Sequence, residues 1–311
     1  MTQSDSLEST ELGIGHDELQ TLFDPFVLRD FEASDAEWRG ELKRRKRKLA
    51  KQGLKRLIGW RGQGKRDESA VLKEYQRSWD RVDYGVYDVQ ARRTQGVPWE
   101  WQSRRMLASE VGGTRVRQLL LCRVIEKLRP RRVLEVGCGN GINLVLLSGR
   151  FPGISFSGVE LTESGHRVAR TLQESPELPK AIVKFAPLPI VDPTAFRRID
   201  FQRGSAAELP FPDASFDLVY SVLAVEQMEQ IRSQALSEIA RASARHVLMI
   251  EPFRDVNQEL WTRLNVYRRD YFRGSIDELR QYGLVPEIVT SDFPQETFLR
   301  VCLVLARKSG S

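Results

Sequence analysis

Three glycines at alternate positions, Gly137, Gly139 and Gly141, separate two apolar runs in the stretch RRVLEVGCGNGINLVLL. A strand, a glycine turn and a helix in this order bring bare backbone and free N–H groups close to a ligand. A dinucleotide site of the G-x-G-x-x-G type would need glycine where this chain has Ile142. Glu135, just before the turn, would repel a pyrophosphate. The stretch therefore predicts a site for a cationic ligand.

A second acid ends the next apolar run, SFSGVE. This residue, Glu160, lies nineteen positions after Gly141. An acid at the end of the second strand of such a unit can bind both hydroxyls of a ribose. The alternative interpretation is a solvated acid at a strand end. In register with the glycines, Glu160 favours a nucleoside as the ligand.

The elements that must position these residues alternate along the chain. Short apolar runs predict strands at RVLEV, SFSGVE, IDFQRG, FDLVYS, HVLMIE, LVPEIVT and FLRVCLVLAR. An amphipathic helix, TRVRQLLLCRVIEKL, precedes them and ends at Pro130. This alternation predicts an α/β fold with parallel strands and helices on both faces of the sheet. A proline-rich stretch at about 172–197 is longer than a crossover needs, and we expect an insertion over one sheet edge.

The segment VLEVGCGNG resembles the first motif of the class I S-adenosylmethionine-dependent methyltransferases, and the resemblance extends over about residues 115–308. ELPFPDASFDLVYS, ARHVLMIEPF and YGLVPEIVT resemble later segments of that family in the same order. The resemblance implies a Rossmann-like, doubly wound, mostly parallel seven-stranded sheet with an antiparallel last strand. It implies S-adenosyl-L-methionine as the cofactor. The cofactor-binding residues that it indicates are Glu135, Gly137, Cys138, Gly139, Asn140, Gly141, Glu160, Leu161, Ser205, Ala206 and Ser221.

The resemblance also assigns roles within this set. The glycine motif would hold the aminoacyl part of the cofactor, Glu160 the ribose hydroxyls, and Leu161 would face the adenine. Ser205 and Ala206 stand where relatives commonly have an acid for the adenine amino group. We expect a hydroxyl or a backbone group to replace that acid.

The segment SVLAVEQME concerns catalysis. Many small-molecule methyltransferases that this chain resembles have an acid followed by a histidine here, whereas this chain has Glu226 followed by Gln227. Glutamine cannot take up a proton at neutral pH. If a base is needed, we expect it to be Glu226, Glu251 or a tyrosine such as Tyr84. An acid at a helix start near the cofactor is an equal interpretation of Glu226.

The region before the sheet divides by charge. Residues 1–40 carry ten acids and two bases, whereas residues 41–66 carry twelve bases and one acid. We expect an acidic head and a basic arm over 1–66, flexible or partly helical. Over 67–114 we expect a helical lid or cap, in which Trp79, Tyr84 and Tyr87 close over the cofactor or simply pack. Trp99 and Trp101 could line an acceptor pocket or pack against the core.

Several acceptor classes lack their typical sequence features. There is no [DN]-P-P-[YFW] stretch for amino methylation of DNA bases, no Pro-Cys pair for cytosine C5, and no metal-ligand spacing. We expect methyl transfer (EC 2.1.1.-) to an oxygen or nitrogen, less readily a carbon, of a small-molecule acceptor. This acceptor could be free or linked to a lipid or a glycan. An RNA methyltransferase that uses the basic arm and an inactive cofactor-binding partner or regulatory subunit are the alternatives.

The partners and the compartment follow from charge and cysteines. The arm at 41–66 could contact an anionic membrane, follow the phosphates of RNA, or be neutralised by the acidic head. The head lacks the apolar core of a signal peptide, and no apolar window is long enough to span a membrane. Three cysteines without C-x-x-C spacing suit a reducing compartment. We expect a cytoplasmic protein, peripheral at the inner membrane surface if the arm binds lipid.

Overall fold

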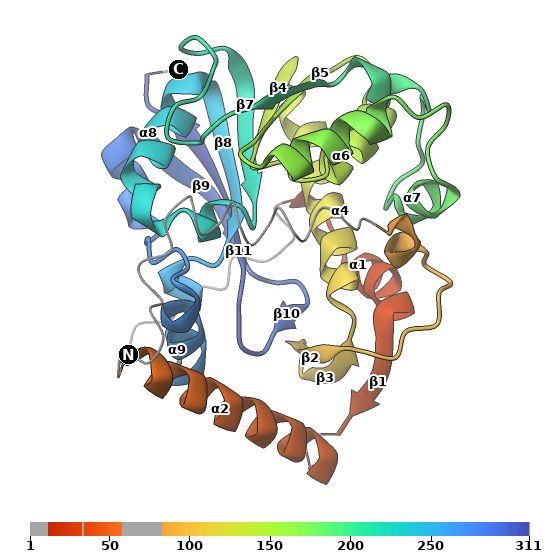
Figure 1. The fold of residues 1–311 in the computed structure, drawn as a ribbon, viewed down its shortest axis with the longest axis vertical. Coiled ribbons are helices and arrows are strands. Elements are labelled where there is room, and N and C mark those ends of the chain that lie inside the picture. The colour runs from red at the N-terminus through yellow and green to blue at the C-terminus, as the bar shows by residue number, and fades with distance from the viewer. Residues whose placement is uncertain (1–11, 33, 58–82, 311) are drawn as a thin grey trace.

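The computed structural model describes residues 12–32, 34–57 and 83–310 of the chain. Their core is a seven-stranded sheet in the order β6-β5-β4-β7-β8-β11-β9 (Figure 1). The strands from β6 to β8 pair in parallel, whereas β11 runs antiparallel to both of its neighbours. This confirms the predicted Rossmann-like sheet and all seven predicted strands. They are β4 (Arg132–Val136), β5 (Ser155–Glu160), β6 (Asp200–Arg203), β7 (Phe216–Val222), β8 (Ser243–Glu251), β9 (Leu284–Thr290) and β11 (Cys302–Lys308).

Helices cover both faces of this sheet. Successive residues of a strand point to opposite faces, so Val133 packs into one apolar cluster and Leu134 into the other. α4 and α5 contribute to the first cluster and α8 to the second. Because both faces are buried, the strands form near-continuous apolar runs in the sequence. The helices are α4 (Glu110–Leu128), α5 (Ile142–Arg150), α6 (Glu163–Gln173), α8 (Arg232–Ala242) and α9 (Leu260–Arg269).

A second, antiparallel sheet with the order β1-β3-β2-β10 lies below the first in the view of Figure 1. The predicted helical cap over 67–114 is wrong for residues 97–108, which form the hairpin of β2 and β3; residues 67–82 lie outside the described part. Both turn residues of the hairpin, Gln102 and Ser103, have positive φ (48° and 66°). Such turns usually contain Asn-Gly, which is absent here. The strands are β1 (Val27–Phe31), β2 (Val97–Trp101), β3 (Arg104–Ala108) and β10 (Gln295–Glu296).

The two tryptophans of β2 pack against the body of the protein. The ring centroid of the buried Trp99 lies 5.1 Å from that of Phe23. The indole N–H of Trp101 donates to a carboxylate oxygen of Asp292 at 2.9 Å. Both tryptophans therefore pack against other residues, and neither lines the cavity described below.

Of the two expectations for the head, flexible or partly helical, the flexible one is wrong for residues 12–31, which are partly helical and belong to the fold. Leu19 and Phe23 of α1 and Phe26 just after it are buried in the cluster that contains α4. A Cβ at Gly112 of α4 would lie 2.8 Å from the Cβ of Phe26, so the glycine permits this close approach. The apolar residues of the head are too widely spaced to reveal this packing. The elements are α1 (His16–Phe23), the 3-10 helix η2 (Asp24–Phe26), and β1.

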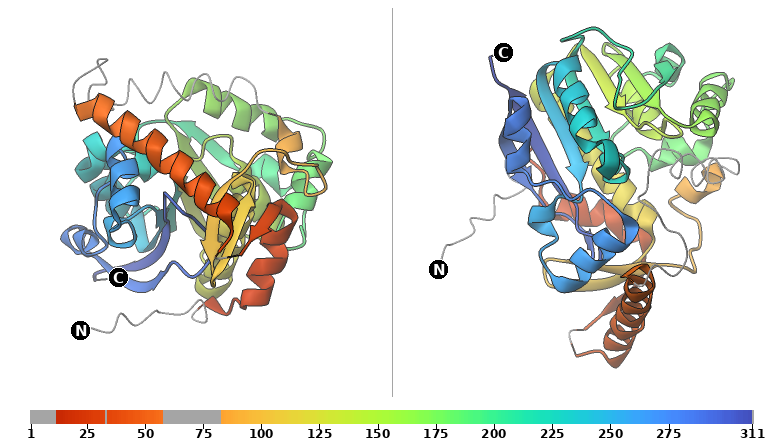
Figure 2. Two further views of the ribbon diagram at one scale, coloured as in Figure 1. Left: turned by 90° about the horizontal axis from the view of Figure 1, so that it is seen from below. Right: turned by 60° about the vertical axis from the view of Figure 1, so that its left-hand side comes forward.

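The basic arm is expected to be flexible or partly helical, and its described part, residues 41–57, lies in the helix α2 (Ala36–Leu57). It crosses the underside of the molecule (Figure 2, left) and packs beside α9. Trp38 and Leu49 are buried on its inner side. No helix within 12–32, 34–57 and 83–310 is long and apolar enough to cross a membrane.

The insertion at about 172–197 leads into the edge strand β6. It contains α7 (Lys180–Phe185), which packs against the 3-10 helix η3 (Tyr84–Tyr87). The ring centroids of Phe185 and Tyr87 lie 5.0 Å apart. The insertion thereby supports the segment that borders the cavity described next.

Candidate active site

The glycine turn between β4 and α5 has the conformation that only glycine adopts readily. Gly137, Gly139 and Gly141 have φ values of 75°, 53° and 74°, in the left-handed region. A Cβ at Gly137 would lie 2.5 Å from the Cβ of Ala224. The chain after β7 therefore approaches the turn as closely as bare backbone allows.

The carboxylate of Glu160 holds this turn from the end of β5. One oxygen accepts the Gly139 N–H at 2.9 Å. The other accepts the backbone N–H of Thr162 at 2.9 Å and its hydroxyl at 2.5 Å. Glu160 is buried, so the alternative of a solvated acid at a strand end is wrong.

Glu135 is a buried carboxyl at the start of the turn. One oxygen accepts a hydrogen bond from the Asn143 side chain at 2.6 Å, and the other has no partner among the described residues. Burial raises the pKa of Glu135 to about 8, although the polar side chains of Asn143 and Tyr220 oppose this. A buried, unpaired carboxyl oxygen is costly unless a ligand satisfies it. A cationic group with N–H donors fits this position.

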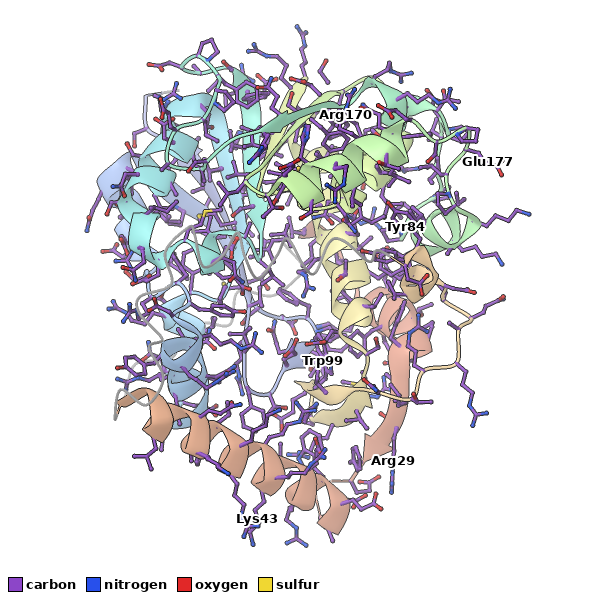
Figure 3. All side chains as sticks on the ribbon, in the orientation of Figure 1. Arg29, Lys43, Tyr84, Trp99, Arg170 and Glu177 are labelled. Carbon is purple, nitrogen blue, oxygen red and sulfur yellow. The ribbon has the colours of Figure 1, made fainter. Side chains whose placement is uncertain are left out.

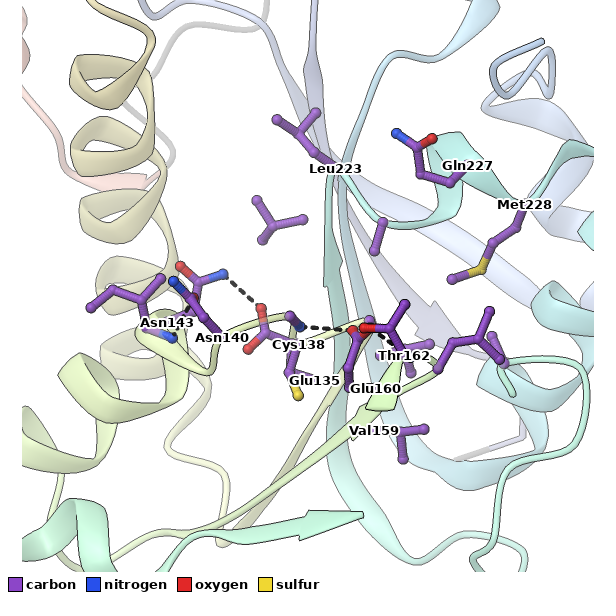
Figure 4. Close-up of a pocket in the computed structure, with 18 of the residues that line it drawn as sticks. Glu135, Cys138, Asn140, Asn143, Val159, Glu160, Thr162, Leu223, Gln227 and Met228 are labelled. Carbon is purple, nitrogen blue, oxygen red and sulfur yellow. Dashed lines mark hydrogen bonds between the residues drawn. The ribbon is translucent and has the colours of Figure 1, made fainter. Parts of the chain in front are cut away.

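These groups line a cavity of about 300 Å³ at the carboxyl ends of the parallel strands, where this kind of sheet binds ligands (Figure 4). Eight of the predicted residues line it: Glu135, Gly137, Cys138, Gly139, Asn140, Glu160, Leu161 and Ala206. Six predicted residues do not line it: Gly141, Ser205, Ser221, Glu226, Glu251 and Tyr84.

Three of the six support its walls. Gly141 caps α5, where a Cβ would lie 2.7 Å from the Phe201 ring. The Ser205 hydroxyl accepts the Ala207 N–H at 3.1 Å and so shapes the turn before β7. Ser221 is buried within β7.

The loop after β7 is held by Glu251. One carboxylate oxygen accepts the N–H groups of Ala224 and Val225, and the other accepts the N–H of Glu226, each at 3.1 Å. Burial raises the pKa of Glu251 to about 7, while Ser221 and these three N–H groups oppose the rise. Glu251 therefore supports the loop after β7 and does not line the cavity.

The same loop brings Gln227 to the cavity. Its amide nitrogen donates to Glu226 at 2.6 Å, and its carbonyl oxygen is buried without a partner among the described residues. Figure 4 shows the Gln227 side chain at the cavity. Burial and the nearby Glu251 raise the pKa of Glu226 to about 8. Leu223, in the same loop, has a positive φ of 51° and also lines the cavity. A backbone held in this strained region is typical of functional loops.

The aromatic residue that reaches the cavity from the N-terminal region is Tyr87 rather than Tyr84. The Tyr87 hydroxyl accepts a hydrogen bond from the Asn140 side chain at 3.3 Å. Burial and the adjacent Tyr87 raise the pKa of Tyr84 to about 12. The Tyr84 hydroxyl therefore stays protonated at neutral pH, which disfavours it as a proton acceptor. Trp79, the third expected lid residue, lies outside the described residues.

Sequence reasoning missed the polar side chains that α4 and α5 contribute. Thr114 and Arg117 of α4 and Asn143 of α5 line the cavity. A terminal nitrogen of Arg117 donates to the Thr114 hydroxyl at 3.2 Å, and its Nε is buried without a partner among the described residues. Only weak features of the sequence could have predicted these residues. Asn143 is the one polar residue in the apolar stretch INLVLL, and Thr114 and Arg117 are one helical turn apart.

The histidines and cysteines of the described part of the chain form no metal site, and of them only Cys138 lines the cavity, at its glycine turn. Within the described ranges, no group of three or more His, Cys, Asp and Glu side chains could hold a metal ion. The cysteines are buried and free, and burial raises the pKa of Cys122 and Cys302 to about 12. His246 lies on β8 five residues before Glu251, and a ring nitrogen of His166 lies 3.2 Å from the carbonyl oxygen of Phe201. Neither histidine lines the cavity.

The buried carboxyls predict how stability depends on pH. Burial raises the pKa of Glu135 and Glu226 to about 8 and that of Glu251 and Glu296 to about 7, against 4.5 for an ordinary glutamate. Between about pH 4.5 and these raised pKa values, the folded state binds more protons than the unfolded state. The free energy of unfolding should therefore fall as pH rises, by up to about 1.4 kcal/mol per pH unit for each proton.

Calorimetric unfolding should thus show a Tm that decreases from about pH 5.5 to about pH 8.5. Glu226→Gln should flatten this decrease, because the glutamine cannot ionise. Glu163→Gln, at an exposed site on α6, should follow the unmodified chain. Equal slopes for Glu226→Gln and Glu163→Gln would contradict the assignment of Glu226 as a protonated buried carboxyl.

Comparison with known proteins supplies independent findings. Residues 134–249 match a family model described as a methyltransferase domain. The chain is 33% identical over 120 residues to the rice protein named "Probable tocopherol O-methyltransferase, chloroplastic", and 30% identical over 115 residues to the phthiotriol/phenolphthiotriol dimycocerosates methyltransferase 1 of Mycobacterium ulcerans. Each match covers 37% of this chain but 27% and 34% of the relatives, so the chain spans about a third or less of their length.

A solved structure also resembles this one. The magnesium protoporphyrin IX methyltransferase of Synechocystis, a structure with bound SAH, aligns with a TM-score of 0.48 at 14% sequence identity. The alignment covers 78% of this chain and all of that one.

Proposed function

We propose that this chain, which carries a class I S-adenosylmethionine-dependent methyltransferase domain, transfers a methyl group to an oxygen or nitrogen of a small-molecule acceptor. The observation that carries the proposal is the cavity itself. It joins the glycine turn and Glu160 to one oxygen of Glu135 and the carbonyl oxygen of Gln227, neither of which has a partner among the described residues. One part of the cavity thus suits the methyl donor, and the other presents a polar atom to an acceptor.

The residues present fit S-adenosylmethionine. Its α-amino group would meet the unpaired oxygen of Glu135, and its ribose hydroxyls would meet Glu160. Leu161 and Ala206 would line the adenine end, where this chain has no acid. When bound, the cofactor supplies a methyl group already activated by the adjacent sulfonium. The protein need only place a nucleophile in line with that methyl, exclude water and accept a proton.

Arg117 is a second buried charged side chain in the cavity that a ligand could satisfy. Its buried guanidinium makes no ion pair with a described carboxylate and lines the cavity beside Thr114. Burial lowers the pKa of Arg117, while the field of nearby acids opposes this. An anionic group in the cavity would remove the cost of that buried charge. The carboxylate of the cofactor or of an acceptor meets this requirement.

Gln227 would orient the acceptor. Because its amide nitrogen is held by Glu226, its carbonyl oxygen is the atom left to accept a hydrogen bond from an acceptor O–H or N–H. Glu226 does not line the cavity, and its raised pKa keeps it mostly protonated at neutral pH, so it would hold Gln227 in position rather than take up the proton. Gln227 itself orients without accepting the proton.

Replacing Gln227 by alanine should lower kcat/KM by about ten- to a hundredfold, since one hydrogen bond to the reacting group is lost. The affinity for S-adenosylmethionine should change by less than about threefold. Steady-state kinetics and calorimetric titration measure the two effects. Gln258→Ala, at an exposed site, is the control. A parallel loss of cofactor affinity would place Gln227 in the cofactor site instead.

The proposal is tested by incubating the purified chain with methyl-labelled S-adenosylmethionine and fractionated cell extract. We expect label in soluble metabolites or in the lipid fraction, the latter for a lipid-linked acceptor. Label in RNA would replace the small-molecule proposal by the RNA alternative. Tight cofactor binding without label in any fraction would favour a regulatory, non-catalytic role.

A further inference from the structure

The outward side of α2 is uniformly basic. From residue 43 to residue 54 the helix carries seven basic residues and no acidic one. Lys43, Arg47, Lys48 and Lys51 are exposed, and none of them forms an ion pair with another described residue. Lys43 points away from the fold at its lower edge (Figure 3). This arrangement places several positive charges side by side, and no described acid forms an ion pair with them.

The described acidic residues of the head form no ion pair with the basic side chains of α2. Five of these seven acids form ion pairs with Arg29, Arg104 or Arg123, and Glu41 pairs within α2 itself with Arg44 and Arg45. Pairing of the basic arm with the acidic head is therefore not found among the described residues. The pairs of the head and of the start of α2 are Asp24–Arg104 at 2.5 Å, Asp30–Arg104 at 2.6 Å, Glu18–Arg123 at 2.7 Å, Asp35–Arg29 at 4.0 Å and Glu37–Arg29.

Exposed apolar side chains accompany the charges. Leu54 of α2 is 58% exposed, and Leu260 and Tyr267 of the adjoining α9 are 71% and 40% exposed. The two helices are in contact, with the ammonium group of Lys46 lying 5.6 Å from the ring centroid of Trp261. Leu260 and Tyr267 are seven residues apart and so share one side of α9.

We propose that this combined surface, defined by Lys43, Arg47, Lys51, Leu54, Leu260 and Tyr267 and called the α2–α9 surface, binds a bilayer that contains anionic lipids. Clustered cations are attracted to the negative surface of such a bilayer, and neighbouring apolar side chains enter its interface. Exposed leucines have no favourable site on a phosphate backbone, where cations and aromatic stacking dominate. The mixture of charges and leucines therefore favours lipid over RNA.

The test is cosedimentation of the full-length chain with vesicles. It should bind vesicles of phosphatidylcholine with about 30% phosphatidylglycerol, less at high salt, and bind pure phosphatidylcholine vesicles at least about tenfold more weakly. Lys43→Glu/Arg47→Glu/Lys51→Glu should weaken binding to the anionic vesicles at least about tenfold. A triple variant with the same change of net charge, Lys127→Glu/Lys180→Glu/Lys184→Glu, alters exposed residues of α4 and α7 and should bind like the unmodified chain.

The apolar part of the surface has its own matched pair. Leu260→Ser/Tyr267→Ser should weaken vesicle binding severalfold, whereas Val183→Ser/Val191→Ser, which alters exposed apolar residues elsewhere, should not. If both charge variants lost vesicle binding equally, binding would depend on net charge alone and the proposal would be overturned. Tighter binding to single-stranded RNA than to anionic vesicles, with no effect of the serine substitutions, would also overturn it. Neither outcome depends on methyltransferase activity.

Discussion

Replacing Glu160 by glutamine is expected to weaken the binding of S-adenosylmethionine by about a hundredfold, the loss of two charge-assisted hydrogen bonds. The carboxylate accepts from Gly139 and from both donors of Thr162. Glutamine keeps one accepting oxygen and turns a donor toward groups that are themselves donors. The glycine turn would lose its anchor, and the ribose would lose its charged partner.

Calorimetric titration measures this effect. Glu163→Gln removes the same charge three residues later from an exposed position on α6 and should leave the affinity unchanged. A circular dichroism melt of each variant establishes that both remain folded. An affinity of Glu160→Gln within threefold of the unmodified chain would show that Glu160 is not part of the cofactor site.

Replacing Gly137 by alanine should both destabilise the protein and abolish cofactor binding. The new Cβ would lie 2.5 Å from the Cβ of Ala224, at a backbone φ of 75°. The left-handed conformation costs about 1–2 kcal/mol for a residue with a Cβ. Overpacking against the loop after β7 adds about 1–3 kcal/mol. Together they predict a loss of about 2–5 kcal/mol.

Chemical denaturation measures the loss, with Gly153→Ala as the matched control. A Cβ at Gly153 meets nothing within 4 Å, and the residue is exposed. That variant should be as stable as the unmodified chain and should bind the cofactor normally. If Gly137→Ala retained both properties, the close approach of the two loops would not be a feature of the folded protein.

The central sheet could be predicted from the sequence because its strands are buried on both faces. Val133 and Leu134, or Leu248 and Met249, face opposite clusters, so each strand appears as an uninterrupted apolar run. The second sheet could not be predicted. Its turn at Gln102 lacks the usual residues, and β10 contains two residues that pair with a strand almost two hundred positions earlier.

The candidate site divides in the same way. Glu135, Gly137, Gly139 and Glu160 belong to a local pattern, and the structure brings them to one cavity. Gln227 and Arg117 reach that cavity through the geometry of the loop after β7 and of α4, which no short pattern encodes. Glu251 appeared as a possible base from its place at a strand end. Its three backbone hydrogen bonds are visible only once the loop is folded over it.

The most direct measurement is transfer of a labelled methyl group by three purified proteins: the unmodified chain, Glu160→Gln and Glu163→Gln. All are incubated with labelled S-adenosylmethionine and the same extract. If the chain is a methyltransferase that binds its cofactor through Glu160, label should enter an acceptor fraction with the unmodified chain and with Glu163→Gln. With Glu160→Gln, the amount of label transferred at subsaturating cofactor should fall at least about tenfold. Equal labelling by all three proteins, or none by an unmodified chain that binds the cofactor, would contradict this account.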